Sequence, residues 1–443
     1  MINGPIDKNL LLGQVGHTLI LKLITLFCDK MTLKPKKSLN VFIHTLHLSA
    51  LKLTASSHIS DIELFKSQLN EYPERALLLV DSDDYIILNH YPDQDYLDYL
   101  MDIGIGTRNI LIPATQGESL SDNVLKDEQL LTFLRKLGET ENQVVLHPYM
   151  STPAEAEIAS KINATVNGPP PELAMKINSK IYLPSLLHEL ALPIPEYKIA
   201  NSVTVIETAK QLIDKYQKII ILGEHSYGGL AVWPITNKEA LNAFKQKVSK
   251  CKTTERFLVE KMYEVLCSQN IQYLMSSDSI QELGMTDQIL DDKLEHHGNT
   301  YPSSATQLDK IKSYSHRIGE KLQSQGYKGL LGIDLIETLD GNVFVVDING
   351  RANASSFGLN VIGKLFPDSY QQKHFKILTH INVGKKVTFA ELKEILGKET
   401  LFDKQTGQGF IPYNTGFLQW GKLSAIVIAN TQREANRLSF VRL

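Results

Sequence analysis

Short apolar runs alternate with helical patterns along the first third of the chain. The clearest strand-like runs are residues 76–80, 109–112 and 143–146. Alternation of this kind is typical of an open α/β layer. The pattern therefore predicts an N-terminal α/β domain.

A helix and a stiff break follow that layer. Thr152 and Glu155 have the spacing of a capping box, with a proline between them, and predict a helix running toward Ile162. Residues 167–171 read Asn-Gly-Pro-Pro-Pro, which interrupts regular structure and marks the first predicted domain boundary.

The remainder of the chain mixes helices and strands. A helical stretch is predicted over 172–190, and apolar strands over 219–222 and 257–259. In the tail, residues 389–396 predict a charged helix and 424–429 a strand. Thr431 and Glu434 then form a second capping box, which predicts a last helix.

Length and charge exclude several classes of protein. At 443 residues the chain is too long for one compact core, so two or three domains are expected. The net charge is −3 and the only dense basic stretch is 34–37, which argues against a nucleic-acid partner.

The apolar run 10–27 is interrupted by Gln14, His17 and Lys22, so we expect a helix of a soluble protein and no membrane partner. The three cysteines lack C-x-x-C spacing, and we expect a reducing, cytoplasmic setting.

Residues 329–351 carry the most informative pattern. Two β-rich runs flank Asp340-Gly341, a dipeptide that favours a two-residue type I′ turn. That turn predicts a hairpin in which Leu335 pairs with Val346.

The same register places Asp334 directly opposite Asp347. Side chains alternate along a strand, so Asn349 and Arg351 should face the same side as Asp347, whereas Glu337 faces the other side and is interpreted as structural. Opposed carboxylates repel, so a cation is expected between them, and two carboxylates with an amide oxygen suit Mg²⁺. The alternative is a solvent-facing acidic hairpin with Arg351 as its counter-charge.

This hairpin resembles the metal-binding hairpin of the ATP-grasp superfamily. The resemblance implies that Asp334, Asp347 and Asn349 hold Mg²⁺ and the phosphates of ATP, and that Arg351 acts on the transferring group. The second acid is usually Glu in this superfamily and is Asp347 here, which is a shorter ligand.

The resemblance extends upstream in the expected order. Asn-Ser-Lys180, followed by Leu-Pro-Ile-Pro195, is similar to the segment that supplies an early phosphate-contacting lysine. Residues ending in Glu260, Lys261 and Met262 are similar to the hinge whose backbone binds adenine, with Glu260 facing the nucleotide.

Further fragments are similar to ATP-grasp peptide ligases that have a preceding α/β domain. These fragments are residues 284–288, 298–302, 413–416 and 421–423. The expected fold is α/β and α+β: a pre-ATP-grasp-like open α/β domain, a two-lobed ATP-grasp fold and a small C-terminal α/β segment. The expected bounds are 1–166, 167–365 (lobes about 200–260 and 261–365) and 366–443.

One position departs from the superfamily pattern. The strand before the glycine loop normally ends in a phosphate-binding lysine, and Leu222 stands there. The loop 223–229 keeps backbone donors that can cradle phosphate oxygens, although a plain glycine-rich hairpin turn fits equally well. The candidate nucleotide contacts in this loop are His225, Ser226, Gly228 and Gly229.

By this resemblance the expected activity is ATP-dependent ligation of a small carboxylate to an amine through an acyl-phosphate, with ATP and Mg²⁺ as cofactors. Two rivals remain: a Mg-ATP-binding protein with weak or no turnover, which Leu222 motivates, and an ATP-dependent phosphotransferase.

The adjacent His296 and His297 are interpreted as a polar loop because neighbours on a strand face opposite sides. The sequence does not fix the oligomeric state, for which a homodimer is one option.

Overall fold

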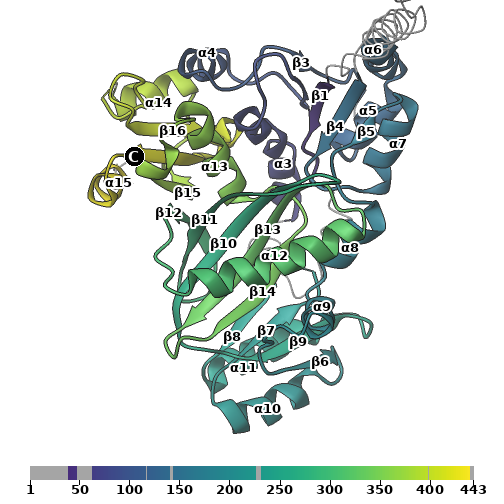
Figure 1. Cartoon of the computed structure of the whole chain (residues 1–443), viewed down its shortest axis with the longest axis vertical. Coiled ribbons are helices and arrows are strands. Elements are labelled where there is room, and N and C mark those ends of the chain that lie inside the picture. Colours follow the sequence, from purple (N-terminus) through teal and green to yellow (C-terminus); the bar gives the residue numbers. More distant parts are fainter. Residues whose placement is uncertain are drawn as a thin grey trace, which may run out of the picture.

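The computed structural model describes residues 38–46, 62–115, 117–139, 143–225, 231–397 and 399–439. These residues build three sheets, which Figure 1 shows at the upper right, through the centre and upper left, and at the bottom of the molecule. The apolar run 10–27 and Cys28 lie outside the described residues. Within the described residues, no helix combines the length and apolar character needed to cross a membrane.

The N-terminal sheet is parallel, as the alternating pattern predicts. Its strand order is β3-β2-β1-β4-β5, and every neighbouring pair is parallel. The strands are β1 (Ser38–Ile43), β2 (Tyr85–Ile87), β3 (Ile110–Leu111), β4 (Gln143–Pro148) and β5 (Thr165–Val166). The helices of this part are α3 (Ile62–Leu69), α4 (Gln94–Ile103), α5 (Leu120–Lys126), α6 (Glu128–Glu139) and α7 (Pro153–Lys161).

The predicted strand over 76–80 is wrong. This segment lies in a 3₁₀ helix, η1 (Tyr72–Leu78), and the turn that follows it. Ala76 and Val80 are completely buried, and a short buried apolar run has the same pattern in a strand and in a helix. Pro73 in the first turn favours the helix because its ring fixes φ.

The capping box at the start of α7 is confirmed. Thr152 caps the helix, Glu155 completes the box, and the helix ends at Lys161 with Ile162 as its C-cap. Because the proline at its first turn has no N–H to satisfy, it costs the helix nothing there.

The predicted single helix over 172–190 is two helices. They are α8 (Pro171–Ile177) and α9 (Leu183–Glu189). The chain leaves the helix at Asn178, whose side chain donates to the carbonyl of Ala174 at 2.7 Å. This break matters because it contains Lys180.

The smallest sheet has four antiparallel strands in the order β6-β9-β7-β8. They are β6 (Tyr197–Asn201), β7 (Ile219–Gly223), β8 (Val232–Ile235) and β9 (Arg256–Lys261). Helices α10 (Val205–Tyr216) and α11 (Lys238–Val248) cover one face, at the bottom of Figure 1. Ile219 and Ile221 point to the core under these helices, so Ile220 and Leu222 point to the other face.

The largest sheet has eight antiparallel strands in the order β14-β13-β10-β11-β12-β15-β17-β16. They are β10 (Val265–Met275), β11 (Ile280–Leu290), β12 (His296–Tyr301), β13 (Gly329–Thr338), β14 (Val343–Asn349), β15 (His374–Asn382), β16 (Gly409–Tyr413) and β17 (Lys422–Ala429). Helix α12 (Leu308–Ser324) crosses β10 and β13, as Figure 1 shows. The remaining helices are α13 (Ala354–Leu365), η2 (Tyr370–Gln372), α14 (Phe389–Leu396), η3 (Thr415–Trp420) and α15 (Gln432–Ser439).

The last three strands of this sheet come from the C-terminal segment. Helix α14 has the predicted bounds, and Thr431 Oγ1 donates to Glu434 at 3.0 Å where α15 is predicted to begin. One buried cluster joins Leu78 of η1, Phe357 of α13 and Ile426 of β17. The N-terminal and C-terminal segments therefore share a core beside the large sheet, and the domain bounds given above stay predictions.

Candidate active site

The acidic hairpin forms, but not with the predicted turn. Gly341 N donates to Thr338 O and Thr338 N to Asn342 O, both at 2.9 Å, so three residues form the loop. Gly341 occupies its left-handed position with φ of 78°, as three-residue hairpin loops require. The two-residue type I′ turn is therefore wrong.

The predicted pairing of Asp334 with Asp347 is nevertheless confirmed. Below it, Leu335 pairs with Val345, and not with Val346 as predicted, because a β-bulge interrupts the ladder. A bulge adds one residue to one strand, so it cancels the one-residue shift that the longer turn introduces. The two carboxylates end up on one face of the hairpin.

Lys180 is the cation beside this pair. Its Nζ lies 2.7 Å from Asp347 Oδ2, with 8% of the lysine side chain exposed and 27% of the aspartate. Lys180 N donates to Glu224 O at 2.9 Å, and Ser179 Oγ donates to Glu224 Oε1 at 3.1 Å. These bonds fasten the break between α8 and α9 to the end of β7, and hold the ammonium against the hairpin.

Asp334 is buried among amide donors. Asn270 Nδ2 donates to one carboxylate oxygen and Asn349 Nδ2 to the other, the latter at 3.0 Å. Burial, with the charge of Asp347, raises the pKa of Asp334 to about 6, although both amide bonds oppose this shift. The carboxylate is thus held where its charge is costly, as expected of a group that meets a cation in use.

Sequence reasoning missed the residues that support Asp334. Asn270 and Gln272 lie on β10 and are fully or almost fully buried. Gln272 donates to Asn270 Oδ1 and, at 3.0 Å, to Asn353 Oδ1, and accepts from Ser356 at 2.7 Å. The available signal was a run of amide side chains inside an apolar strand, because buried amides need partners.

Glu260 brings a third carboxylate to the same place. It is buried on β9, and burial raises its pKa to about 7; Lys180 lowers it and Asp347 raises it further. The adjoining Lys261 N and Met262 N donate to the carbonyls of the flanking loops at 2.9 and 3.1 Å. Lys261 and Met262 would therefore meet a nucleotide through their carbonyls or side chains.

Leu222 lines the cleft described below. It is 7% exposed and lies beside Ile220, which pairs with Glu260 across the β7–β9 ladder. His225 is described and lies 3.7 Å from Glu224, but it does not line the cleft described below. Ser226, Gly228 and Gly229 lie outside the described residues.

A cleft of ≈ 400 Å³ joins these groups, and its lining comes from the two antiparallel sheets and from η1 and Tyr149 of the N-terminal part. One end is apolar and lies between β7, β8 and β9. It is lined by Pro195, Ile220, Leu222, Val232, Met262 and Tyr263. The middle carries Lys180, Glu260, Asp334, Asp347, Asn349 and Arg351. The structure thus brings together eight of the twelve predicted site residues, since Lys261 and Met262 also line the cleft.

Arg351 marks the passage to the other end. Its guanidinium carbon lies 5.7 Å from the ring centre of Tyr149, which follows β4. Beyond it the lining comes from η1, α13 and the C-terminal strands, and includes Arg75 and Asn414. No local pattern marked these residues, because they meet only through the tertiary fold.

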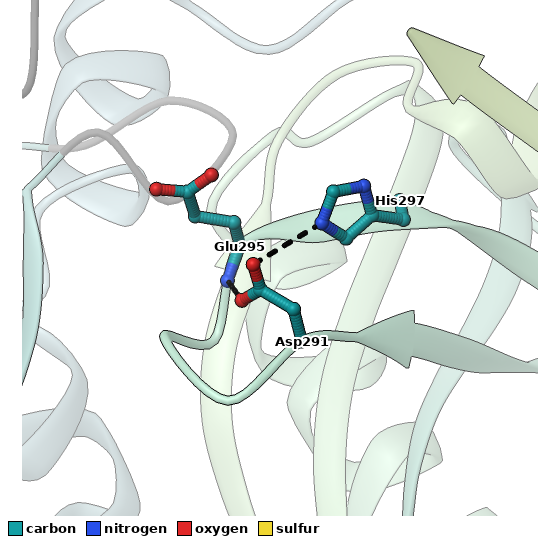
Figure 2. Close-up of side chains that lie close together, drawn as sticks. All are labelled: Asp291, Glu295 and His297. Carbon is teal, nitrogen blue, oxygen red and sulfur yellow. Dashed lines mark hydrogen bonds and ion pairs between the residues drawn. The ribbon is translucent and has the colours of Figure 1, made fainter. Parts of the chain in front are cut away.

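The interpretation of His296 and His297 as a polar loop is wrong, because both lie at the start of strand β12. They point to opposite sides of that strand, as neighbours on a strand do. His296 Nε2 lies 2.9 Å from Asn299 Oδ1 and lines the cleft. His297 lies outside it with Asp291 and Glu295, whose ligand atoms all lie within 4.8 Å of one another. In Figure 2 Asp291 bonds both to the backbone of Glu295, at 2.9 Å, and to His297, at 3.3 Å. These bonds account for the exposed cluster without an ion.

Two family models match the chain. Residues 199–349 match the family described as L-aspartate–L-methionine ligase, ATP grasp, and residues 73–164 match the pre-ATP-grasp domain. The [butirosin acyl-carrier protein]–L-glutamate ligase of Niallia circulans is 21% identical over 303 residues, which cover 65% of this chain and 66% of that protein, just under two thirds.

Two solved structures show the same fold across almost the whole chain. The N5-carboxyaminoimidazole synthetase of Staphylococcus aureus with ADP superposes with a TM-score of 0.56 at 11% identity, covering 92% of this chain and 97% of that one. The biotin carboxylase domain of Hydrogenobacter thermophilus 2-oxoglutarate carboxylase, in complex with MgADP, ADP and bicarbonate, gives 0.54 at 13% identity, covering 91% and 89%.

Proposed function

Because the chain belongs to the ATP-grasp superfamily and carries a pre-ATP-grasp domain, we propose that it is an ATP-dependent ligase that joins a carboxylate to an amine. One observation carries the proposal. Asp334 and Asp347 face each other across the hairpin, with Asn349 and Arg351 on the same cleft. An acidic pair of this kind, next to an apolar pocket and a buried lysine, suits Mg-ATP.

The donor set fits magnesium. Two carboxylates and one amide oxygen are hard ligands, and Mg²⁺ prefers few protein oxygens together with phosphate oxygens. Asn349 already uses its Nδ2 to bond Asp334, which leaves its Oδ1 as a metal ligand. When bound, the ion would offset negative charge on the phosphates of ATP.

The chain's own residues divide the remaining work. The apolar pocket under β7 and β9 would take the adenine, and Lys180 would move from Asp347 toward the phosphates. Arg351 would steady the oxygens of the transferring phosphoryl group with its planar donors. A substrate carboxylate would attack the γ-phosphate, releasing ADP, and an amine would displace phosphate from the acyl-phosphate to form the amide. Positioning and electrostatics would supply most of the rate.

The names of the relatives suggest a substrate class. Both the matched family and the Niallia circulans relative carry an acidic amino acid in their names, L-aspartate and L-glutamate. We propose that an amino acid is one substrate here as well. The direct test incubates the protein with ATP, Mg²⁺ and pooled L-amino acids, and measures ADP release together with new amides by mass spectrometry. ADP without amide, and with a phosphorylated amino acid, would instead indicate a phosphotransferase.

Magnesium should be required for nucleotide binding. We expect Mg-ATP to raise the melting temperature much more than ATP with EDTA, because a ligand that binds only the folded state stabilises it by RT ln(1 + [L]/Kd), about 2.7 kcal/mol at 100 times Kd. Differential scanning fluorimetry measures both shifts. Equal shifts with and without the metal would contradict the magnesium assignment.

Leu222 favours a second candidate, a nucleotide-binding protein with little turnover. A lysine at this position would meet phosphate, and a charge-assisted hydrogen bond contributes about 1.5 to 3 kcal/mol. We therefore expect Leu222→Lys to tighten Mg-ATP binding by about tenfold or more, as measured by isothermal titration calorimetry.

The matched control is Leu222→Met, which keeps size and polarity and should leave the affinity within about twofold. If Leu222→Lys binds no tighter although it folds normally, another group already fills the role of the missing lysine. Lys180 is a candidate for this role, since it lies at the acidic pair.

A further inference from the structure

The end of the cleft beyond Arg351 is built around a second buried guanidinium. Arg75 of η1 is 6% exposed and lines the cleft. Its guanidinium carbon lies 4.8 Å from the ring centre of Tyr72, 4.4 Å from that of Tyr149 and 5.3 Å from that of Phe357. Three aromatic faces hold the planar group in place, so little entropy is lost when it binds a ligand.

Tyr149 connects this guanidinium to the acidic hairpin. Arg351 lies 5.7 Å from the same ring centre, so the two guanidinium carbons are at most about 10 Å apart. A small molecule that reaches the phosphoryl-transfer position near Arg351 can therefore also contact Arg75.

The charge of the cleft changes sign along its length. All the carboxylates that line it among the described residues lie in the middle: Glu260, Asp334 and Asp347. Beyond Arg351 the described lining contains Arg75 and Lys422 and no acid. A cleft with one sign of charge concentrates ligands of the opposite sign, so this end suits an anionic group.

Glu74, the residue before Arg75, does not make this end of the cleft acidic. Glu74 turns away to η3, where it accepts from Thr415 Oγ1 at 2.8 Å and from Gly416 N at 3.3 Å. Burial raises the pKa of Glu74 to about 7, which reduces its negative charge at neutral pH. Burial and then the charge of Arg75 lower the pKa of His44 well below its usual value, so this histidine is neutral beside it.

Asn414 adds a hydrogen-bond acceptor at the same end. It is 6% exposed, lines the cleft and has a left-handed backbone with φ of 54°. Its Oδ1 is buried and has no hydrogen-bond partner among the described residues. A buried amide oxygen without a partner is costly, and a ligand N–H would satisfy it.

We propose that the Arg75 end of the cleft is an amino-acid site, in which Arg75 binds the carboxylate that does not react and Asn414 Oδ1 accepts from the amino group. The site rests on the proposed ligase function, whose substrate it specifies. A carboxylate on one side and an N–H donor on the other distinguish a free amino acid from a neutral amide or a simple amine.

The test titrates the whole chain with each of the twenty proteinogenic L-amino acids, with and without Mg-ADP, and determines Kd by calorimetry. The tightest binder is then compared with its α-carboxamide. We expect the wild type to prefer the acid over the carboxamide, and Arg75→Met to bind the acid about 10- to 150-fold more weakly while binding the carboxamide as wild type does. Mg-ADP affinity should stay within about twofold.

Two further variants separate binding from folding. Arg108→Met removes an exposed arginine of the same domain that pairs with Asp98, and should change no affinity. Arg75→Lys keeps the charge but not the planar fork, so its preference for the acid should fall even where Arg75→Met fails to fold. The proposal is overturned by a wild type that binds no amino acid or binds acid and carboxamide alike, or by an unchanged preference in the Arg75 variants. Failure of Mg-ADP to bind would count against the ligase function alone, because the titrations without nucleotide still report on Arg75.

Discussion

Asp334→Asn should leave the unliganded protein about as stable as wild type and abolish both Mg-dependent stabilisation and ADP release. The substitution removes a buried negative charge that Asp347 repels, which stabilises the folded protein. It also places an NH₂ group where one carboxylate oxygen was, so the amide N–H of either Asn270 or Asn349 loses its acceptor. This loss costs about 1 kcal/mol of folding free energy. The two effects nearly cancel without metal, whereas the holo site loses a ligand.

Thermal melts with and without Mg-ATP, together with ADP assays, measure these effects. The control is Glu337→Gln, on the other face of β13. Burial raises the pKa of Glu337, but hydrogen bonds from the Thr306 side chain and from the backbone of Thr306 and Gln307 outweigh it. The pKa of Glu337 is therefore lowered, and the fold favours its charged form. Glu337→Gln should therefore lower the melting temperature equally with and without Mg-ATP. If instead Glu337→Gln removes the magnesium effect and Asp334→Asn does not, the metal site lies on the other face.

The hairpin shows what sequence periodicity can and cannot predict. The alternation of strand side chains correctly indicated that Asp334 and Asp347 meet, because the buried face of β13 fixes the register. The turn type was wrong, since Asp-Gly also suits a three-residue loop, and a bulge at Val346 restored the pairing. Bulges depend on packing at both faces and leave no clear local signal.

The strand prediction for the apolar run 76–80 failed for a related reason. Its residues are buried on all sides, and such a run carries no period that separates a strand from a helix. The capping box predicted at Thr152 forms, and at Thr431 the threonine Oγ1 accepts from Glu434 N at 3.2 Å, because these hydrogen bonds are made within four residues. Local chemistry was therefore predictable where its partners are local.

The cleft itself was only half predictable. Its acidic part, the proposed metal site, lies on one hairpin and has a recognisable motif, whereas its other end joins η1, the loop after β4 and the turn before η3. Arg75 and Asn414 are 339 positions apart, so no window of sequence contains both. Such sites require the tertiary structure, because side chains from distant segments share no periodicity.

Lys180→Met should destabilise the unliganded protein by about 2 to 3 kcal/mol and weaken Mg-ATP binding by about 10- to 150-fold. Lys180 forms an ion pair with Asp347. Without Lys180 the negative charges of Asp347, Asp334 and the nearby Glu260 would repel one another with no cation from Lys180 to offset them. Breaking a buried ion pair costs about 3 to 5 kcal/mol, and this value is reduced because Asp347 is 27% exposed. The loss of a phosphate contact accounts for the weaker nucleotide binding.

Urea unfolding measures the first effect and calorimetry the second. Lys218→Met is the matched control, because the exposed Lys218 lies 3.9 Å from Glu264 and does not line the cleft; it should change stability by less than about 1 kcal/mol. Adding Asp347→Asn to Lys180→Met should restore most of the stability without metal, since it removes the charge that Lys180 neutralises, but should not restore Mg-ATP binding. A Lys218→Met variant that loses nucleotide affinity, beside a Lys180→Met variant that keeps it, would assign the phosphate contact to Lys218. It would also mean that Lys180 only balances the charge of the empty site.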